Sequence, residues 1–375
     1  MWLRTKKGLP KFTLGYPNDA KRPRRVIDDN AWHIVFREEF HEKKLWHSEW
    51  DKERDYTNEV LSILPDDMRG QYSLKTERLI RRFGNEIKSN GAFLLASPGD
   101  ITAIMGLSGA GKTVFLKMIC GYDRPSSVIY SGGAEAPMND NAICICGETG
   151  EKAFRYLGYV PQGDVLYPEL TTEQSLRYRM RLRFGNLLTE DDITQCIHHV
   201  CFELLKLEPN TIKMQIGQMD WIGPYPSGGQ RRRINIAHEL VLEPHVLILD
   251  EPTSGLSSKD SEELMDALKG LAYSKQLCIV MTIHQPSENM FKKIEDLLLF
   301  VSGGSLAYYG RRSLALDWLR LSTTKPEEDV PESENDAETI LNMISVPSAK
   351  IRYPNMFENF LMRCGGTKSK ITTLI

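Results

Sequence analysis

The eight residues GLSGAGKT, at positions 106–113, restrict the fold of this chain more than any other segment. They follow the apolar run DITAIM, which is typical of a strand, and precede VFLKMICG, whose apolar spacing favours a helix. A strand that turns tightly through glycines into a helix aims backbone N–H groups at one point, where the helix dipole also favours negative charge. We therefore predict a phosphate-binding turn formed by Gly106, Leu107, Ser108, Gly109, Ala110, Gly111, Lys112 and Thr113.

The last two residues of this turn add charge and a metal ligand. The segment satisfies the pattern G-x-x-x-x-G-K-[ST] with a strand before it and a helix after it. Lys112 supplies a positive charge for the β- and γ-phosphates of a nucleotide, and Thr113 supplies a hydroxyl for Mg²⁺. The turn therefore predicts a nucleoside triphosphate with Mg²⁺, but it does not choose among kinases, GTPases and ATPases.

Four further apolar runs, YLGYVPQ, HVLILDE, CIVMTIH and DLLLFVSGG, alternate with helical segments and predict a mostly parallel sheet with helices on both faces. Three of these runs end in polar residues, which should meet at one edge of the sheet. Asp250 is placed to hold Mg²⁺, and Glu251 is placed to polarise the attacking water. Gln162 and His284 end the neighbouring runs, where the γ-phosphate would lie.

A second glycine turn, PSGGQRRRINIAHEL, covers residues 226–240. Ser227, Gly228, Gly229 and Gln230 predict another anion-binding turn at a helix N-terminus, whereas the three arginines that follow would by themselves indicate a solvated face. Two phosphate turns are redundant within one nucleotide site. The second turn is explained if it closes over the nucleotide held by another copy.

Together these motifs resemble the ATP-binding cassette (ABC) family of transport ATPases, over about 230 residues and in the family's order. The residues that match are Walker A at 106–113, the Q-loop Gln162, the signature at 227–230, Walker B at 246–250 and the H-loop His284. The family's aromatic base-stacking position falls on Phe83, which lies 23 residues before Gly106, with Tyr72 as the alternative. The segments YVPQGDVLYPELTTEQSLRY, TIHQPS and FVSGGSLAYYG are most similar to the ABCG (White-like) subfamily and its bacterial relatives.

The resemblance implies an α/β fold, a P-loop NTPase (RecA-like) core with an antiparallel β subdomain and an α-helical signature subdomain at about 173–240. It implies ATP and Mg²⁺, with Gln162 joining Thr113 and Asp250 as metal ligands, and Gln162 joining Glu251 and His284 in catalysis. It also implies head-to-tail pairing with a second cassette, homo- or heterodimeric, and a transmembrane permease domain. The expected role is ATP hydrolysis that drives export of a lipid, sterol or drug-like substrate, at the cytoplasmic face of a membrane.

Three zones divide the 375 residues. Residues 1–65 form a basic, aromatic-rich extension, 66–310 the nucleotide-binding domain, and 311–375 a helix and an acidic linker. In the family such a linker leads to a transmembrane domain, here expected on a separate polypeptide or absent from the sequence, because no apolar run approaches the roughly 18 residues of a spanning helix. The net charge of −3 gives no electrostatic argument for nucleic acid. Cys144 and Cys146, in the alternating AICICG, are expected to be structural rather than metal ligands.

One departure from the family pattern concerns Ser257, which stands where an aspartate of the D-loop is expected. The segment SSKD fits a capping box, in which Ser257 begins a helix and Asp260 reaches back to it. Two other functions stay open. A soluble ABC ATPase that acts on ribosomes or nucleic acid usually has two cassettes or a coiled-coil insertion, and a low-turnover regulatory module is at odds with the intact Glu251 and His284.

Overall fold

The computed structural model describes residues 72–129, 135–217, 223–321, 335–350, 352–355 and 357. The predicted extension at 1–65 and the acidic stretch at 322–334 lie outside the described residues.

A six-stranded sheet forms the centre of the molecule, in the order β10-β11-β12-β5-β13-β14. All neighbours in it run parallel except β14, which is antiparallel to β13. Every residue of β11 and β12 is buried, because helices cover both faces, so these strands read as continuous apolar runs. The strands are β5 (Ile101–Gly106), β10 (Leu157–Val160), β11 (Val246–Leu249), β12 (Cys278–Thr282), β13 (Asp296–Val301) and β14 (Ser305–Arg311).

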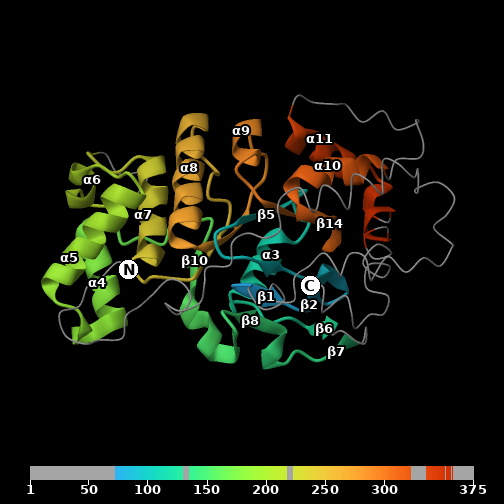
Figure 1. Ribbon diagram of the computed structural model, residues 1–375, viewed down its shortest axis with the longest axis horizontal. Coiled ribbons are helices and arrows are strands. Elements are labelled where there is room, and N and C mark those ends of the chain that lie inside the picture. The colour runs from blue at the N-terminus through green and yellow to red at the C-terminus, as the bar shows by residue number, and fades with distance from the viewer. Residues whose placement is uncertain are drawn as a thin grey trace.

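Two smaller antiparallel sheets lie below this centre in Figure 1. One has the order β4-β1-β8-β9 and the other β3-β2-β6-β7. The pairs β2-β3, β6-β7 and β8-β9 join consecutive strands, whereas β1-β4, β1-β8 and β2-β6 join strands farther apart in the chain. Cys144 lies in β8 and Cys146 just after it, and the described residues hold no cluster of three His, Cys, Asp or Glu that could bind a metal. The strands are β1 (Leu74–Thr76), β2 (Arg78–Phe83), β3 (Glu86–Ala92), β4 (Leu95–Ala96), β6 (Ser127–Ile129), β7 (Glu135–Ala136), β8 (Ile143–Ile145) and β9 (Glu148–Thr149).

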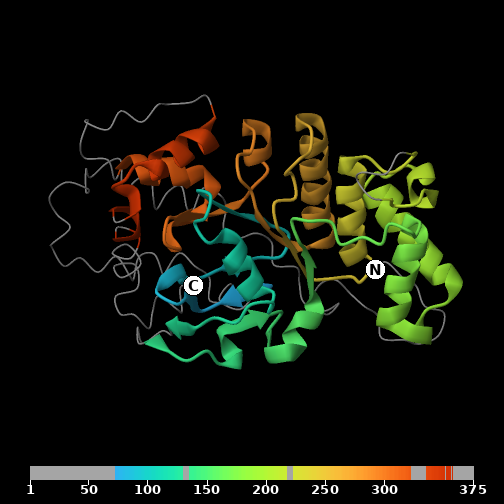
Figure 2. The ribbon, with the colours of Figure 1, turned by 180° about the vertical axis from the view of Figure 1, so that it is seen from behind.

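Apart from α3, the helices fall into three groups in Figures 1 and 2. Helix α3 follows β5; α4 to α7 gather at one end of the molecule; α10 and α11 pack together at the other, with α8 and α9 between. The bounds are α3 (Lys112–Ile119), α4 (Thr172–Phe184), α5 (Glu190–His198), α6 (Pro209–Lys213), α7 (Gly228–Leu240), α8 (Ser258–Lys275), α9 (Glu288–Phe291), α10 (Arg312–Leu321) and α11 (Asp336–Ser345). A π-helical turn, η5 (His199–Leu204), extends α5, and the 3₁₀ turns are η2 (Asp140–Ala142), η3 (Gly150–Tyr156) and η4 (Gly185–Leu187).

The sequence marks where the helices of the α4–α7 group begin. Thr171, Thr189 and Ser227 each precede a helix and accept a hydrogen bond from the backbone N–H three residues later. In each case the side chain at that third residue bonds back, which completes a capping box.

The predicted fold class is confirmed: a parallel α/β core carries an antiparallel β part and a separate group of helices that includes the SGGQ turn. Within the ranges that the structure describes, no helix combines the length and the apolar character that crossing a bilayer requires.

Candidate functional site

The predicted phosphate-binding turn lies where β5 passes into α3. Gly109 and Gly111 have φ values of +76° and +100°, which L-residues rarely adopt, and Gly111 directly precedes the helix. A Cβ on Gly106 would lie 2.5 Å from the Phe300 carbonyl oxygen, and a Cβ on Gly111 would lie 1.9 Å from the Lys88 carbonyl oxygen. Both positions therefore require glycine, because a side chain there would clash with the backbone of β13 or β3.

Lys112 is buried at the first position of α3. Its ammonium donates to the carbonyl oxygens of Gly106 at 2.8 Å and Leu107 at 3.0 Å, so it folds back over the turn. Burial lowers the pKa of Lys112, and the nearby charges of Glu251 and Asp250 oppose that shift. A cation held in this way is positioned to meet the oxygens of a phosphate chain.

Asp250 follows β11 and is 2% exposed. One of its carboxylate oxygens accepts from the hydroxyl of Thr113 at 3.2 Å and from the hydroxyl of Thr282 at 2.6 Å. The structure thus joins the predicted pair Thr113 and Asp250 and adds Thr282, the last residue of β12, which the sequence analysis missed. A threonine in the otherwise apolar run CIVMTIH was the available signal.

Glu251 and Gln162 are also brought together. The Gln162 amide donates to the Glu251 carboxylate at 2.8 Å, and the backbone N–H of Glu251 donates to the Thr282 hydroxyl at 2.8 Å. Glu251 adopts φ +46°, in the left-handed region. His284 is exposed and lies two residues beyond β12, on the strand-end edge that carries Asp250 and Glu251.

The SGGQ turn lies at the start of α7, with the helical group rather than beside α3 (Figure 1). The Ser227 hydroxyl accepts from the backbone N–H of Gln230 and so caps this helix. The side-chain amide of Gln230 donates to the Thr211 hydroxyl at 3.2 Å. Ser227 and Gly228 are exposed. The structure therefore does not bring the second phosphate turn to the first within one chain.

The arginines after this turn contradict the interpretation of RRR as a solvated face. Arg231 and Arg232 are only 8% and 5% exposed, and Arg233 pairs with Glu263 at 2.8 Å. Charge alone in the sequence could not show that the guanidinium groups of Arg231 and Arg232 find carbonyl acceptors inside the protein.

Phe83 ends β2 and is 47% exposed, with the Arg81 guanidinium 4.4 Å above its ring. Its hairpin partner β3 passes beside the phosphate turn, as the contact between Gly111 and the Lys88 carbonyl shows. The aromatic base-stacking role of Phe83 stays a prediction.

Ser257 begins α8, as predicted, and its hydroxyl accepts from the Asp260 N–H at 3.1 Å. The reciprocal half of the capping box differs from expectation. The Asp260 carboxylate accepts from the Ser257 hydroxyl at 2.7 Å instead of reaching the backbone N–H of Ser257.

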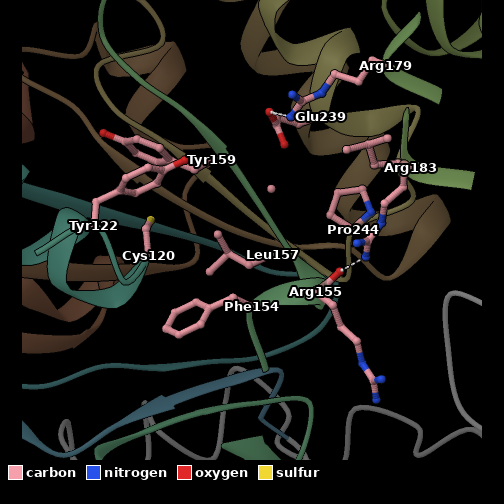
Figure 3. A pocket seen from close by; sticks show the side chains of 12 residues that line it. Cys120, Tyr122, Phe154, Arg155, Leu157, Tyr159, Arg179, Arg183, Glu239 and Pro244 are labelled. Atoms are coloured by element: carbon pink, nitrogen blue, oxygen red, sulfur yellow. Dashed lines mark hydrogen bonds and ion pairs between the residues drawn. The ribbon is translucent and has the colours of Figure 1, made fainter. Parts of the chain in front are cut away.

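A separate cavity of about 250 Å³ lies between the end of α3, the start of β10, and α4 and α7 (Figure 3). The rings of Tyr122 and Tyr159 lie against each other with centroids 5.1 Å apart, and Arg179 donates to the Glu239 carboxylate at one side of the cavity. None of the predicted site residues lines this cavity, so it is distinct from the phosphate turn.

The fold and the site define an ATPase of the ATP-binding cassette class. Residues 90–254 match the family model described as ABC transporter. Among solved structures, cbiO1 from Clostridium perfringens, part of the ABC transporter complex cbiONQ, aligns with a TM-score of 0.53 at 22% identity, covering 68% of this chain and 96% of that one. The ATP-binding cassette MJ0796, in a dimeric post-hydrolysis state with ADP and Pi, aligns with a TM-score of 0.51 at 22% identity, covering 64% of this chain and 98% of that one. At this identity these two likenesses show the fold.

Two curated relatives indicate a subfamily within the ATP-binding cassette class. Putative white-brown complex homolog protein 30 of Arabidopsis thaliana is 36% identical over 57% of this chain and 18% of its own length. ABC transporter G family member 22 of the same plant is 35% identical over 67% of this chain and 32% of its own length. The chain thus spans a third or less of these two relatives. Residues 90–254 thus form an ABC transporter-type ATPase cassette, and the two relatives are of the ABCG, or white-brown, type.

Proposed function

We propose that this chain is the ATP-hydrolysing part of a membrane transporter and works as one of two paired cassettes. The observation that carries the proposal is the separation of two complementary half-sites: the phosphate turn with Asp250 and Glu251 lies on the core, and an exposed SGGQ turn begins α7. A head-to-tail pair would place each SGGQ turn on the nucleotide of the partner cassette.

The residues present fit Mg²⁺. Thr113 and Asp250 offer a hydroxyl and a carboxylate oxygen within 3.2 Å of each other, and Mg²⁺ is usually bound by few protein oxygens together with phosphate and water. The Gln162 side-chain oxygen would be a further ligand. When bound, the ion would neutralise charge that develops on the phosphates.

The chain's own residues would bind the nucleotide and position the attacking water. Lys112 and the backbone N–H groups of the turn would hold the β- and γ-phosphates, and Phe83 would stack on the adenine. Glu251 would polarise the attacking water, with Gln162 and His284 placed near the γ-phosphate. In the described structure Gln162 bonds to Glu251, so this contact would rearrange when a water is bound there.

The proposed partners are a second cassette, identical or different, and a transmembrane permease domain. The position of the chain would then be peripheral, at the cytoplasmic face of a membrane, and transport would be export of a lipid, sterol or drug-like substrate. The names of the two relatives support a transporter, and both relatives are several times longer than the matched segment.

The test is steady-state ATPase activity of the wild-type chain and of Glu251→Gln, with Glu208→Gln as a matched control. Glu208 is an exposed glutamate that precedes α6, in the helical group rather than at the strand-end edge that carries Glu251. We expect Glu251→Gln to lower kcat about a hundredfold or more, because a positioned general base contributes about 10²–10⁴-fold. MgATP should still bind, and size-exclusion chromatography should show an ATP-dependent dimer of the variant.

Equal turnover of the wild type and Glu251→Gln would refute the catalytic assignment. Wild-type turnover stimulated by ribosomes would favour the soluble class of ABC ATPase. Nucleotide binding by the wild type with no measurable turnover would favour a regulatory module.

A further inference from the structure

Arg232 is a charged residue of α7 that the expected chemistry does not use. It lies five residues after Ser227 and is 5% exposed. Burial lowers the pKa of its guanidinium, although the charges of Asp164, Asp250 and Glu251 oppose that shift. A cation buried in this way is costly unless its N–H groups are fully bonded.

All five N–H groups of the Arg232 guanidinium are bonded, and every acceptor is a main-chain carbonyl oxygen. Two acceptors belong to the segment that carries Gln162, and three to the segment that carries Asp250 and Glu251. The oxygens are those of Pro161 at 2.7 Å, Gln162 at 3.1 Å, Asp250 at 2.6 Å, Glu251 at 3.0 Å and Pro252 at 3.1 Å. One side chain from α7 thus holds two strand-end segments together.

The backbone conformation of Glu251 shows why the hydrogen bonds from Arg232 matter. Its φ of +46° is a conformation that a residue with a Cβ keeps only where its surroundings impose it. The Thr282 hydroxyl accepts from its N–H at 2.8 Å, and its carbonyl oxygen accepts from Arg232 at 3.0 Å and from the Ser254 N–H at 3.2 Å. Bonds on both sides of the residue therefore fix the direction of the Glu251 side chain.

A second connection ties the Gln162 segment to the same helix. The Asp164 carboxylate accepts from Arg231 at 2.8 Å and from the Asn235 amide at 2.7 Å. The Val165 N–H donates to the Asn235 side-chain oxygen at 3.3 Å. The loop after Gln162 is thus bonded to α7 on both sides of Gly163.

We propose that Arg232 is a positioning residue for ATP hydrolysis. It fixes the backbones that carry Gln162 and Glu251 relative to α7, and so couples this chain's catalytic edge to the SGGQ turn that would close on a partner's nucleotide. This inference rests on the proposed function, because it assigns the regulation of the same site.

Neither lysine nor glutamine can replace this geometry. A lysine ammonium has three N–H donors at one point, and a glutamine amide has two, so neither spans both segments as the planar guanidinium does. Loss of the hold should displace the Glu251 carboxylate, and a shift of about 1 Å in a catalytic group can cost about 10²-fold in rate. The phosphate turn does not bond to Arg232, so ground-state binding of ATP should persist.

The experiment measures kcat, KM and MgATP binding by titration calorimetry for the wild type, Arg232→Lys and Arg232→Gln. The matched control is Arg181→Gln at the end of α4. Arg181 also donates to two carbonyl oxygens, those of Gly185 at 3.0 Å and Leu188 at 2.8 Å, but it lies in the helical group.

We expect both Arg232 variants to lose about ten- to a hundredfold in kcat while the dissociation constant of MgATP changes less than about threefold. Arg181→Gln should keep wild-type kcat even if its melting temperature falls. If only Arg232→Lys folds, the same separation of kcat from binding should be seen in that variant alone.

An active wild type with unchanged kcat in an Arg232 variant would overturn the inference and leave the proposed function intact. Equal losses of kcat in the Arg232 and Arg181 variants would also overturn it, because a general loss of stability would then explain both. An inactive wild type would instead contradict the proposed function.

Discussion

His238 should make the free energy of unfolding sensitive to acid, and the effect can be worked from its surroundings. It lies in α7, is 9% exposed, and its Nε2 is 3.1 Å from the Ser175 hydroxyl of α4. Burial, helped by the charge of Arg179, lowers the pKa of His238 from 6.5 to about 4. Above pH 6.5 the imidazole is neutral in both the folded and the unfolded state, so His238 then has no pH-dependent effect.

As the pH falls from about 6.5 to about 4, His238 binds a proton in the unfolded chain but stays neutral in the folded chain, so the free energy of unfolding decreases. The loss is about 2.5 kcal/mol at pH 4.5 and approaches about 3.4 kcal/mol below pH 4, at about 1.36 kcal/mol for each pH unit of the shift. Glu243 acts in the opposite direction. Burial raises its pKa to about 7, so the folded state binds this proton first and gains stability as the pH falls from about 7 to about 4.5.

The test compares wild type with His238→Gln, so that Glu243 contributes equally to both. Urea unfolding followed by circular dichroism at pH 7.5 and 4.5 gives the two free energies. At pH 7.5 the variant should be less stable by about 1 kcal/mol or less, since glutamine can keep a hydrogen bond to Ser175. At pH 4.5 it should be more stable than wild type by about 1.5–2.5 kcal/mol.

A matched control is His198→Gln, because His198 is a histidine on the exposed surface of α5. This variant should follow the wild type at both pH values. A difference between wild type and His238→Gln that stays constant with pH would refute the account of a buried, neutral His238.

Two further predictions concern the nucleotide site. Gly111→Ala should lose ATP binding and more than about 2 kcal/mol of unfolding free energy, because its Cβ would lie 1.9 Å from the Lys88 carbonyl oxygen at φ +100°. Gly270→Ala, in the open middle of α8, should be neutral or stabilising when both are measured by thermal unfolding and calorimetry. Phe83→Ala should raise KM for ATP about fivefold to a hundredfold with kcat unchanged, as expected for lost base stacking worth about 1–3 kcal/mol. An unchanged KM would move the stacking role away from Phe83.

The sequence by itself determined the elements whose signals are local. The glycines of 106–113 need positive φ or close backbone contacts, and the apolar runs need burial on both faces, so the turn and the five strands it predicted are in place. Helices α4, α5, α7 and α8 each begin after a Thr or Ser whose side chain accepts a hydrogen bond from the backbone N–H three residues later. These signals act over a few residues and do not depend on the rest of the chain.

Only the tertiary structure decided which side chains meet across the sheet. The register that pairs Leu249 with Met281 sets Asp250 beside Thr282, and the pairing of Val160 with Leu249 brings Gln162 to Glu251. Register depends on packing between strands that are far apart in the sequence, which a single run of residues does not encode locally.

The arginines of RRRIN are a second case in which the sequence did not show which groups a side chain contacts. Periodicity and charge could not distinguish a solvated guanidinium from Arg232, whose acceptors are backbone oxygens 18 to 71 residues away. Carbonyl oxygens belong to every residue and leave no mark in the sequence, so only the folded chain shows which of them a buried cation finds.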